Sequence, residues 1–411
     1  MLGARRHYLV PEVMAELGVL CCFVTDVFVA RPGWLQTALV VVGRKLRMRS
    51  LRALAGRSSP RIPTERIVAL HGLGLRYALA RRLRRSGDAR LFAAVNRRFC
   101  LRAASHLGAV DVCWAYNGAA LELFEAACAR NIRCVLEQVI APRSDELREL
   151  ALARQDWPQW AGADDLQSAA SDPLAAREQA EWHLADIVVA GSRYVQDCLE
   201  KSAAPKSRCI VVPSAVDLER FRVGTDVRSG GPLRVLFVGQ INLRKGAPYL
   251  LDAVRRLGSP HIRLKLIGAV HAPHHCVRAF APWAEFAGPV PPAEIAAHYQ
   301  WADIVVVPSV CEGSAMVSYE ARGCGVPIVA TPNAGAAFAP GVDGLEIPVR
   351  DVEAIALILD RLARDRGQVR ELREGAVANR CALGRDAYRD RIRQVLEVVG
   401  TRPPRDLKMP A

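Results

Sequence analysis

The sequence predicts an α/β protein with two doubly wound domains, each a parallel sheet covered by helices. With 411 residues the chain exceeds the roughly 100 to 200 residues of an ordinary domain. Short apolar runs that end at turn residues alternate with helix formers in both halves, as strands buried on both faces do. Residues 185–192 and 302–309 are near copies of each other, which indicates two similar sheets.

The apolar runs give the expected elements in chain order. Strands are expected at residues 20–28, 110–116, 132–137, 185–192, 209–213, 233–239, 262–268, 302–309 and 327–331. Helices are expected at residues 249–257, 293–301 and 317–322, and a long helical pattern follows residue 351.

A polar, Gly-rich segment at residues 222–232 predicts a linker between the two domains. The expected domains are therefore residues 1–222 and 232–385, followed by a C-terminal helix and frayed tail at 386–411. A doubly wound domain normally opens on a strand, and none is evident before residues 3–7. Either the N-terminal sheet lacks its first strand or the start codon is assigned too late, and the sequence allows both.

Composition excludes several classes of protein. A chain with 51% hydrophobic and 24% charged residues is not globally disordered. The twelve cysteines stand singly, apart from Cys21 and Cys22, and show no metal-ligand spacing, which favours a reducing compartment and no metal site. No signal peptide is evident, and the longest apolar run, residues 19–30, is shorter than the ~18 to 20 residues of a spanning helix. We therefore expect a cytoplasmic protein.

Positive charge is concentrated in residues 1–110, which contain 20 Lys and Arg against 5 Asp and Glu, a net charge of +15. This asymmetry predicts an anionic partner, such as phospholipid headgroups, lipid-phosphate acceptors or nucleic acid. Residues 44–52 and 81–85 interleave cations with Leu and Met, a pattern typical of a membrane-surface segment at the inner face of the cell membrane. No aromatic platform accompanies the charges, so nucleic acid is not expected. A solvated arginine-rich face is the alternative.

The strongest chemical signal lies in residues 308–331, where a strand ends, a glycine turn follows and a helix is expected to begin near Ser314. A helix start at the carboxyl end of a parallel strand offers free N–H groups and a positive dipole end, where a diphosphate binds favourably. The backbone of Gly313, Ser314, Ala315 and Met316 is the candidate cradle.

Glu312 and Glu320 lie eight positions apart, or about 12 Å if the interval is helical. That span matches a sugar-diphosphate-ribose unit. One carboxylate can accept hydrogen bonds from sugar hydroxyls and the other from ribose hydroxyls. The alternative is a pair of solvated glutamates at a helix end.

A second signal follows the strand expected at residues 233–239, where Gly239 opens a loop that contains Arg244 and Lys245. These cations can neutralise a leaving diphosphate. They would replace a divalent metal, in agreement with the lack of an Asp-x-Asp pair in a strand-end loop. The alternative is a basic surface turn.

These motifs resemble the retaining glycosyltransferase family 4, whose donor domain has a Gly-Arg and Lys-Gly loop and two glutamates separated by seven residues. The resemblance covers residues 233–364 and the domain junction at 209–221. It implies the GT-B fold, an acceptor-binding N-terminal domain facing a donor-binding C-terminal domain across a cleft. It also implies metal-independent transfer of a sugar with retention of configuration, and no cofactor, since the nucleotide-sugar is a substrate.

Carried over by position, Glu312 contacts the donor sugar, Glu320 the ribose and Lys245 the diphosphate. Gln240 departs from the family because arginine is common at this place, which removes one phosphate charge unless Arg244 supplies it. At the junction, Ser214 and Ala215 replace the usual tyrosine and glycine.

The acceptor side is less marked. Glu137 and Arg143 follow an expected strand and are acceptor-side candidates together with His7, although a surface ion pair and a structural histidine are the alternatives. The expected acceptor is a glycan or a lipid-linked precursor. Two rival functions stay open, a nucleotide-sugar epimerase of similar fold and a non-catalytic sugar-nucleotide-binding protein.

Overall fold

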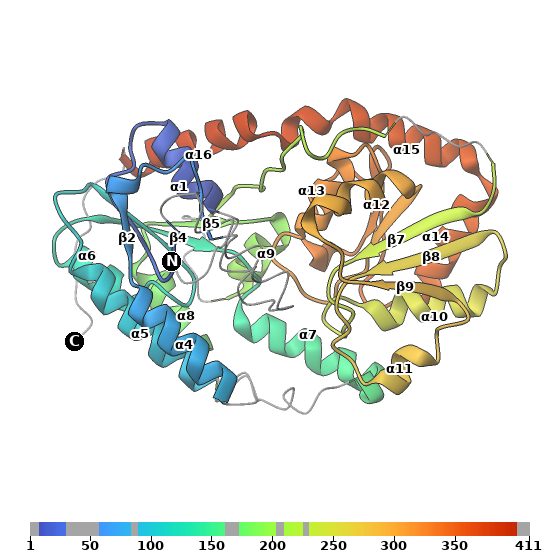
Figure 1. The fold of residues 1–411 in the computed structure, drawn as a ribbon, viewed down its shortest axis with the longest axis horizontal. Coiled ribbons are helices and arrows are strands. Elements are labelled where there is room, and N and C mark those ends of the chain that lie inside the picture. The colour runs from blue at the N-terminus through green and yellow to red at the C-terminus, as the bar shows by residue number, and fades with distance from the viewer. Residues whose placement is uncertain are drawn as a thin grey trace. The chain divides into compact units, whose positions relative to one another are not determined.

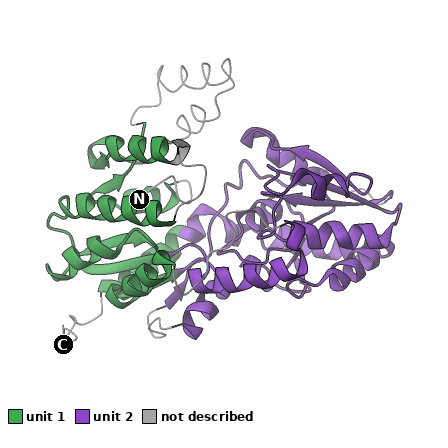
Figure 2. Ribbon diagram, turned by 90° about the horizontal axis from the view of Figure 1, so that it is seen from below, with its two compact units in different colours: residues 1–137, 172–189, 389–411 green, residues 138–171, 190–388 purple. Residues whose placement is uncertain are grey.

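A computed structural model describes residues 8–29, 57–83, 89–160, 172–202, 209–224 and 230–400. The chain forms an α/β fold with parallel strands (Figure 1). It divides into two compact units (Figure 2). Unit 1 contains residues 1–137, 172–189 and 389–411, and unit 2 contains residues 138–171 and 190–388. The domain boundaries expected near residues 222–232 and at 386 stay predictions.

Several features predicted from the sequence lie outside the described residues. They are His7, the basic stretch 44–52, residues 84 and 85, part of the expected linker (225–229) and the tail 401–411.

Unit 2 is built on one six-stranded parallel sheet with the order β12-β11-β10-β7-β8-β9. Its strands are β7 (Leu233–Val238), β8 (Ile262–Ile267), β9 (Ala284–Gly288), β10 (Ile304–Val307), β11 (Ile328–Ala330) and β12 (Gly344–Glu346). The chain moves outward from β7 to β9, returns to β10 beside β7, and moves outward again in the other direction. The strand order therefore reverses between β7 and β10, and the crevice at their carboxyl ends is where such sheets bind ligands.

Alternate residues of the central strands enter two different cores. Val235 and Phe237 of β7 pack in one core with α10 (Ala247–Leu257) and α14 (Val352–Arg364). Leu236 of β7 packs in the other core with α12 (Ile295–Trp301) and α13 (Met316–Gly323). Helices thus cover both faces of the sheet (Figure 1). Both faces of the sheet are buried, which explains why these strands are continuous apolar runs in the sequence.

Helix α14 shows how the sequence determines these boundaries. Asp351 precedes the helix, and its side chain accepts a hydrogen bond of 2.8 Å from the N–H of Ala354. Such N-caps stabilise a helix start by about 1 kcal/mol. Ile355, Leu359 and Leu362 then recur at helical spacing and are buried in the core against the sheet. Unit 2 also contains α7 (Arg143–Asp156), α9 (Arg193–Lys201), α11 (His274–Arg278) and α15 (Arg366–Ala378).

The first half of the chain contains two separate sheets. β1 (Phe23–Thr25) pairs with β2 (Ile67–Ala69) in a two-stranded parallel sheet. The other sheet has the order β3-β4-β5-β6. Its strands are β3 (Val112–Tyr116), β4 (Arg133–Gln138), β5 (Ile187–Ala190) and β6 (Cys209–Val211). Further helices of this half are α1 (Leu9–Glu16), α4 (His71–Leu83), α5 (Ala89–Ala104), α6 (Leu121–Cys128) and α8 (Pro173–Leu184). Helix α16 (Arg385–Gly400) ends the described chain.

A cavity of about 860 Å³ lies within unit 1 beside two of these strands. Its lining includes every residue from 19 to 24 and every residue of β3. Since successive side chains of a strand point to opposite faces, a space that touches all of them must run along the strand edge. The cavity therefore lies along the edge of β3 and beside the segment that leads into β1.

The expected strands are all present, although most are shorter than their apolar runs. The sequence analysis missed β2, β9 and β12. β9 alternates half-buried with exposed side chains, and β12 (Gly-Leu-Glu) contains a single large apolar residue, so neither is a continuous apolar run. Helix α13 begins at Met316, two residues after the expected start. Among the described residues, no helix is long and apolar enough to cross a membrane.

Candidate functional site

The loops that follow β7 and β10 are packed together at the switch point of the unit 2 sheet. Gly246 has a φ of 70°, and a Cβ at this position would lie 1.8 Å from the carbonyl oxygen of Pro308. Only glycine therefore fits here. The N–H of Val310 donates to the carbonyl of Arg244 at 2.9 Å, which joins the two loops through their backbones.

Two cations meet one carboxylate where these loops join. The Arg244 Nη1 lies 3.0 Å from the Glu312 Oε1, and the Lys245 Nζ forms an ion pair with the same carboxylate oxygen. The Asn242 side chain accepts a hydrogen bond of 3.0 Å from the N–H of Lys245 and so fixes the turn that presents the lysine. All three charged side chains are largely buried. The cluster has a net charge of +1 and lies in the loops that follow β7 and β10, where it favours an anion.

The backbone of the loop at residues 311–313 is held by segments distant in the sequence. The N–H of Ala141 donates to the Glu312 carbonyl at 3.1 Å, and the Ser192 hydroxyl donates to the Gly313 carbonyl. A Cβ on Gly313 would lie 1.9 Å from the Val139 carbonyl oxygen, so only glycine allows this approach. Sequence reasoning missed Ala141 and Ser192, because no local pattern marks a partner more than a hundred residues away.

The start of α13 lies next to this loop and has no side-chain cap. Ala315 is the N-cap residue, and its own N–H donates to the Ala334 carbonyl at 3.1 Å. The Ser314 hydroxyl lies 2.8 Å from the Tyr319 hydroxyl. Met316 opens the helix, so the predicted cradle of residues 313–316 forms the approach to a helix start that can bind an anion.

Glu320 lies one turn into α13 and is oriented by a tyrosine from another helix. The hydroxyl of Tyr299, in α12, donates to the Glu320 Oε2 at 2.6 Å. Tyr299 is fully buried, and this burial, followed by the charge of Glu320, holds the pKa of the tyrosine well above its ordinary value. Tyr299 is therefore a permanent donor that orients the carboxylate. No sequence pattern marks Tyr299, because it lies on a different element.

The other predicted site residues have the following places. Gly239 ends β7 with a φ of 144°. Glu137 lies in β4, is fully buried and accepts a hydrogen bond of 3.1 Å from the Trp114 indole N–H. Arg143 opens α7 and forms an ion pair of 2.7 Å with Glu146. Glu137 belongs to unit 1 and Arg143 to unit 2.

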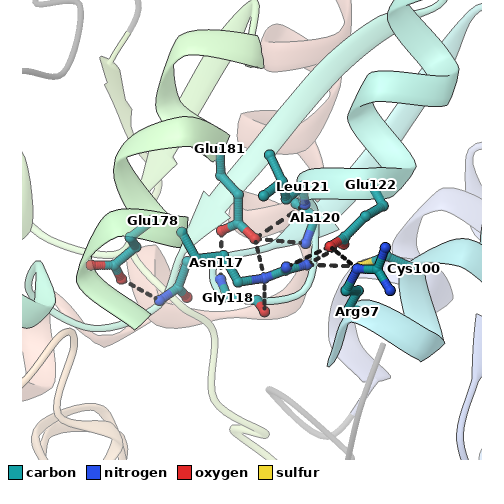
Figure 3. A network of polar contacts seen from close by, with 10 residues as sticks. Arg97, Cys100, Asn117, Gly118, Ala120, Leu121, Glu122, Glu178 and Glu181 are labelled. Atoms are coloured by element: carbon teal, nitrogen blue, oxygen red, sulfur yellow. Dashed lines mark hydrogen bonds and ion pairs between the residues drawn. The ribbon is translucent and has the colours of Figure 1, made fainter. Parts of the chain in front are cut away.

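Unit 1 contains a buried polar network that sequence reasoning missed (Figure 3). The carboxylate of Glu181, on α8, accepts hydrogen bonds from the N–H groups of Gly118 at 2.6 Å, Ala120 at 2.9 Å and Leu121 at 3.2 Å. These N–H groups precede and open α6, so Glu181 occupies the start of that helix. The carboxylate is fully buried, and this burial raises its pKa to about 7 against the opposing effect of the amides and of Arg177.

Arg177 connects the same network to the neighbouring helices. Its Nε donates to the Gly118 carbonyl at 3.0 Å, and its Nη1 donates to the Glu122 carboxylate at 2.8 Å. The Asn117 side-chain amide donates to Glu178 at 2.9 Å (Figure 3). In the sequence these charges of α8 are typical of a solvated helix face, whereas the structure buries them.

Comparison with solved structures defines the class of this fold. The chain is similar to a sucrose-phosphate synthase from Thermosynechococcus elongatus, with a TM-score of 0.61 and 20% identity over 75% of this chain and 79% of that one. It is also similar to HepE from Anabaena in complex with UDP, with a TM-score of 0.59 and 15% identity over 92% and 100% of the two chains. The fold is the GT-B fold of glycosyltransferases, as the sequence predicts.

Sequence comparison finds a family match in unit 2. Residues 232–365 match the family described as glycosyl transferases group 1. D-inositol 3-phosphate glycosyltransferases are among the relatives, with 35% identity over 206 residues in Frankia alni (44% of this chain, 51% of the relative). The relative from Xylanimonas cellulosilytica is 30% identical over 269 residues, which is 58% of this chain and 61% of that protein. The chain thus spans about half the length of the curated relatives it matches. The match of residues 232–365 and the relatives that share this part of the chain confirm the resemblance to family 4.

Proposed function

We propose that this protein is a glycosyltransferase that moves a sugar from a nucleotide-sugar donor to a glycan or lipid-linked acceptor. One observation carries the proposal. Lys245 and Arg244 converge on Glu312 beside the uncapped start of α13, at the switch point of the unit 2 sheet. HepE, which shares the fold, was solved with UDP and glucose and with UDP-glucose, which supports a nucleotide-sugar as the donor here.

In this proposal the donor diphosphate binds over the start of α13 and beside Lys245 and Arg244. It competes with Glu312 for the two cations, and the released carboxylate accepts a hydrogen bond from a sugar hydroxyl. Glu320, oriented by Tyr299, accepts hydrogen bonds from the ribose hydroxyls. Charge-assisted hydrogen bonds of this kind contribute about 1.5 to 3 kcal/mol each.

The transfer step then needs no protein nucleophile. The bond between the anomeric carbon and the diphosphate oxygen breaks, and the acceptor oxygen forms its bond to that carbon on the same face of the sugar. Because the new bond forms on the face that the diphosphate leaves, the configuration is retained, and the leaving diphosphate takes the acceptor proton. Lys245 stabilises the negative charge that develops on the diphosphate, in the place of a metal ion.

On the acceptor side Arg143 and His7 stay proposed contacts, whereas the side chain of Glu137 is fully buried and can only position its neighbours. We also propose a cytoplasmic location, since all twelve cysteines are free, as is usual in a reducing compartment. Activity assays distinguish the two rival functions from this proposal. An epimerase would convert the donor without an acceptor, and a binding protein would not turn it over.

The test is a panel of nucleotide-sugars screened with the purified protein. A donor at ~100 times its dissociation constant stabilises the folded state by about 2.7 kcal/mol and should raise the melting temperature. With that donor, we expect an acceptor to increase the release of nucleoside diphosphate, both with and without a chelator. If a donor binds but is not turned over, the protein is a binding protein and not a transferase. If a chelator abolishes turnover and magnesium or manganese restores it, the site is not metal-free.

A further inference from the structure

The outer face of helices α4 and α5 in unit 1 exposes large apolar side chains. Leu75 and Leu79 of α4 are each 61% exposed, and Leu101 of α5 is 48% exposed. Leu75 and Leu79 are four residues apart, so they lie on the same face of the helix. Single exposed leucines are common, but a pair on one face of one helix favours contact with an apolar phase.

The opposite face of α4 already contributes to the packing of unit 1. Leu73 is buried, and a Cβ on Gly74 would lie 2.5 Å from the Val27 side chain, so the helix is packed tightly at this point. The Tyr77 ring lies 6.2 Å from the Phe92 ring of α5, which fixes the two helices beside each other. Leu75 and Leu79 therefore remain exposed because the core side of α4 is already filled.

The same helices have a strong positive charge. Residues 71–104 contain nine arginines and one aspartate, a net charge of +8. Arg76 of α4 and Arg98 and Arg102 of α5 are exposed. Arg97, by contrast, forms an ion pair of 3.8 Å with Glu122. Apolar and cationic side chains are thus interleaved on adjacent helices.

We propose that the outer face of α4 and α5 docks on an anionic phospholipid bilayer. Each arginine near such a surface contributes about 1 kcal/mol, and the leucines add shallow insertion below the headgroups. Charge complementarity selects an anionic surface, and the exposed leucines select a bilayer over nucleic acid. The exposed side chains described on these two helices include no Phe, Tyr or Trp ring on which a base could stack. The docking needs no catalytic step, so its test is independent of the proposed sugar transfer.

The experiment is flotation of the full-length protein with vesicles of phosphatidylcholine alone or mixed with phosphatidylglycerol. We expect binding that rises with phosphatidylglycerol and falls with salt, because exposed charges are screened beyond about 8 Å at physiological ionic strength. Replacing three arginines should weaken binding by about 100-fold, and replacing the two leucines by about tenfold. The variants are Arg76→Gln/Arg98→Gln/Arg102→Gln and Leu75→Ser/Leu79→Ser.

Unit 2 offers matched controls for both variants. Leu357 of α14 is 62% exposed, so Leu357→Ser removes an equally exposed leucine. The arginine control replaces three exposed arginines of α14 and α15 by glutamine at positions Arg361, Arg364 and Arg370. Unchanged melting temperatures show that all variants fold. No flotation on phosphatidylglycerol vesicles at low salt, an equal loss in the controls, or binding to a random-sequence DNA duplex in place of vesicles would each overturn the proposal.

Discussion

Two strand-to-helix connections, one in each unit, differ in what occupies the start of the helix. Both α6 and α13 have eight residues and follow a parallel strand, β3 and β10 respectively. At α6, the Glu181 carboxylate accepts hydrogen bonds from the opening N–H groups. At α13, the N-cap residue has no side-chain cap, and Glu312 is instead paired with Lys245 and Arg244.

The difference indicates which helix start can bind a ligand. A helix N-terminus favours an anion in either unit. In unit 1 the chain supplies a carboxyl group itself and uses it to fix a loop. In unit 2 the nearby carboxylate is held by two cations, which in the proposed function exchange it for a diphosphate. We therefore expect substitutions in the unit 2 cluster to alter sugar transfer and substitutions at Glu181 to alter stability.

The largest effect is expected for Lys245→Ala. Removing a preorganised charge that stabilises a transition state typically costs about 100 to 1,000-fold in turnover, and we expect a loss in this range. The release of nucleoside diphosphate from the donor identified by screening measures it. Lys201→Ala, which removes a lysine from the last turn of α9, is the control. Turnover within a factor of about two of the wild type would show that Lys245 does not neutralise the diphosphate.

Glu320→Ala is expected to have the next largest effect, and on donor binding above all. Loss of a charge-assisted hydrogen bond costs about 1.5 to 3 kcal/mol, equivalent to about 10 to 100-fold in the dissociation constant. Calorimetric titration with the donor measures this change. Glu312→Ala should instead lower kcat mainly, because its contact is with the reacting sugar.

Tyr299→Phe separates the effect of the Glu320 carboxylate itself from the effect of the hydrogen bond that orients it. The variant retains the carboxylate but removes the hydroxyl that donates to it. We expect a weaker loss of donor affinity, of about 0.5 to 1.5 kcal/mol, since only one neutral donor is lost. An equal loss in Tyr299→Phe and Glu320→Ala would mean that disruption of the helix pair, and not contact with the ribose, weakens binding.

The sequence predicted the sheet and the two loops because their signals are local. Val305 and Val307 mark β10 by their position in an apolar run, and Gly246 and Gly313 mark turns where backbones approach closely. The partners that hold the site are not local. Ser192 lies 121 residues from Gly313 in the chain, so only the folded sheet brings them together.

The charges of α8 show where a sequence pattern predicts the wrong environment for a side chain. A helix that contains Arg177, Glu178 and Glu181 matches a solvated face in any periodicity analysis, because charged residues are rarely buried without partners. Here the partners are Glu122 on α6, Asn117 and the opening N–H groups of α6. Burial therefore depended on tertiary contacts that no sequence window contains.

A separate effect, which leaves sugar transfer untouched, is expected on stability and concerns the pH dependence conferred by Glu181. Its pKa of about 7 in the folded protein lies above its ordinary value of 4.5, because burial disfavours the charged form more than Arg177 and the amides favour it. Between these two pH values the folded state binds more protons than the unfolded state. The free energy of unfolding therefore falls as pH rises from about 4.5 to about 7 and is independent of this group above pH 7.

Glu181→Gln cannot ionise and should lose this part of the pH dependence. At 1.36 kcal/mol per pKa unit, the difference in stability between the variant and the wild type should change by about 2 to 3 kcal/mol across that pH range. Thermal unfolding measured at several pH values tests this, with Glu371→Gln on the exposed face of α15 as a control that leaves the slope unchanged. The sign is decisive. If the stability of the wild type relative to Glu181→Gln rises with pH across this range, the amides and Arg177 outweigh burial, and Glu181 is a permanently ionised anion at the start of α6. If it falls as expected, the start of α6 is closed by a carboxyl group that is partly protonated near neutral pH, and the contrast with the ion-paired Glu312 of unit 2 becomes sharper.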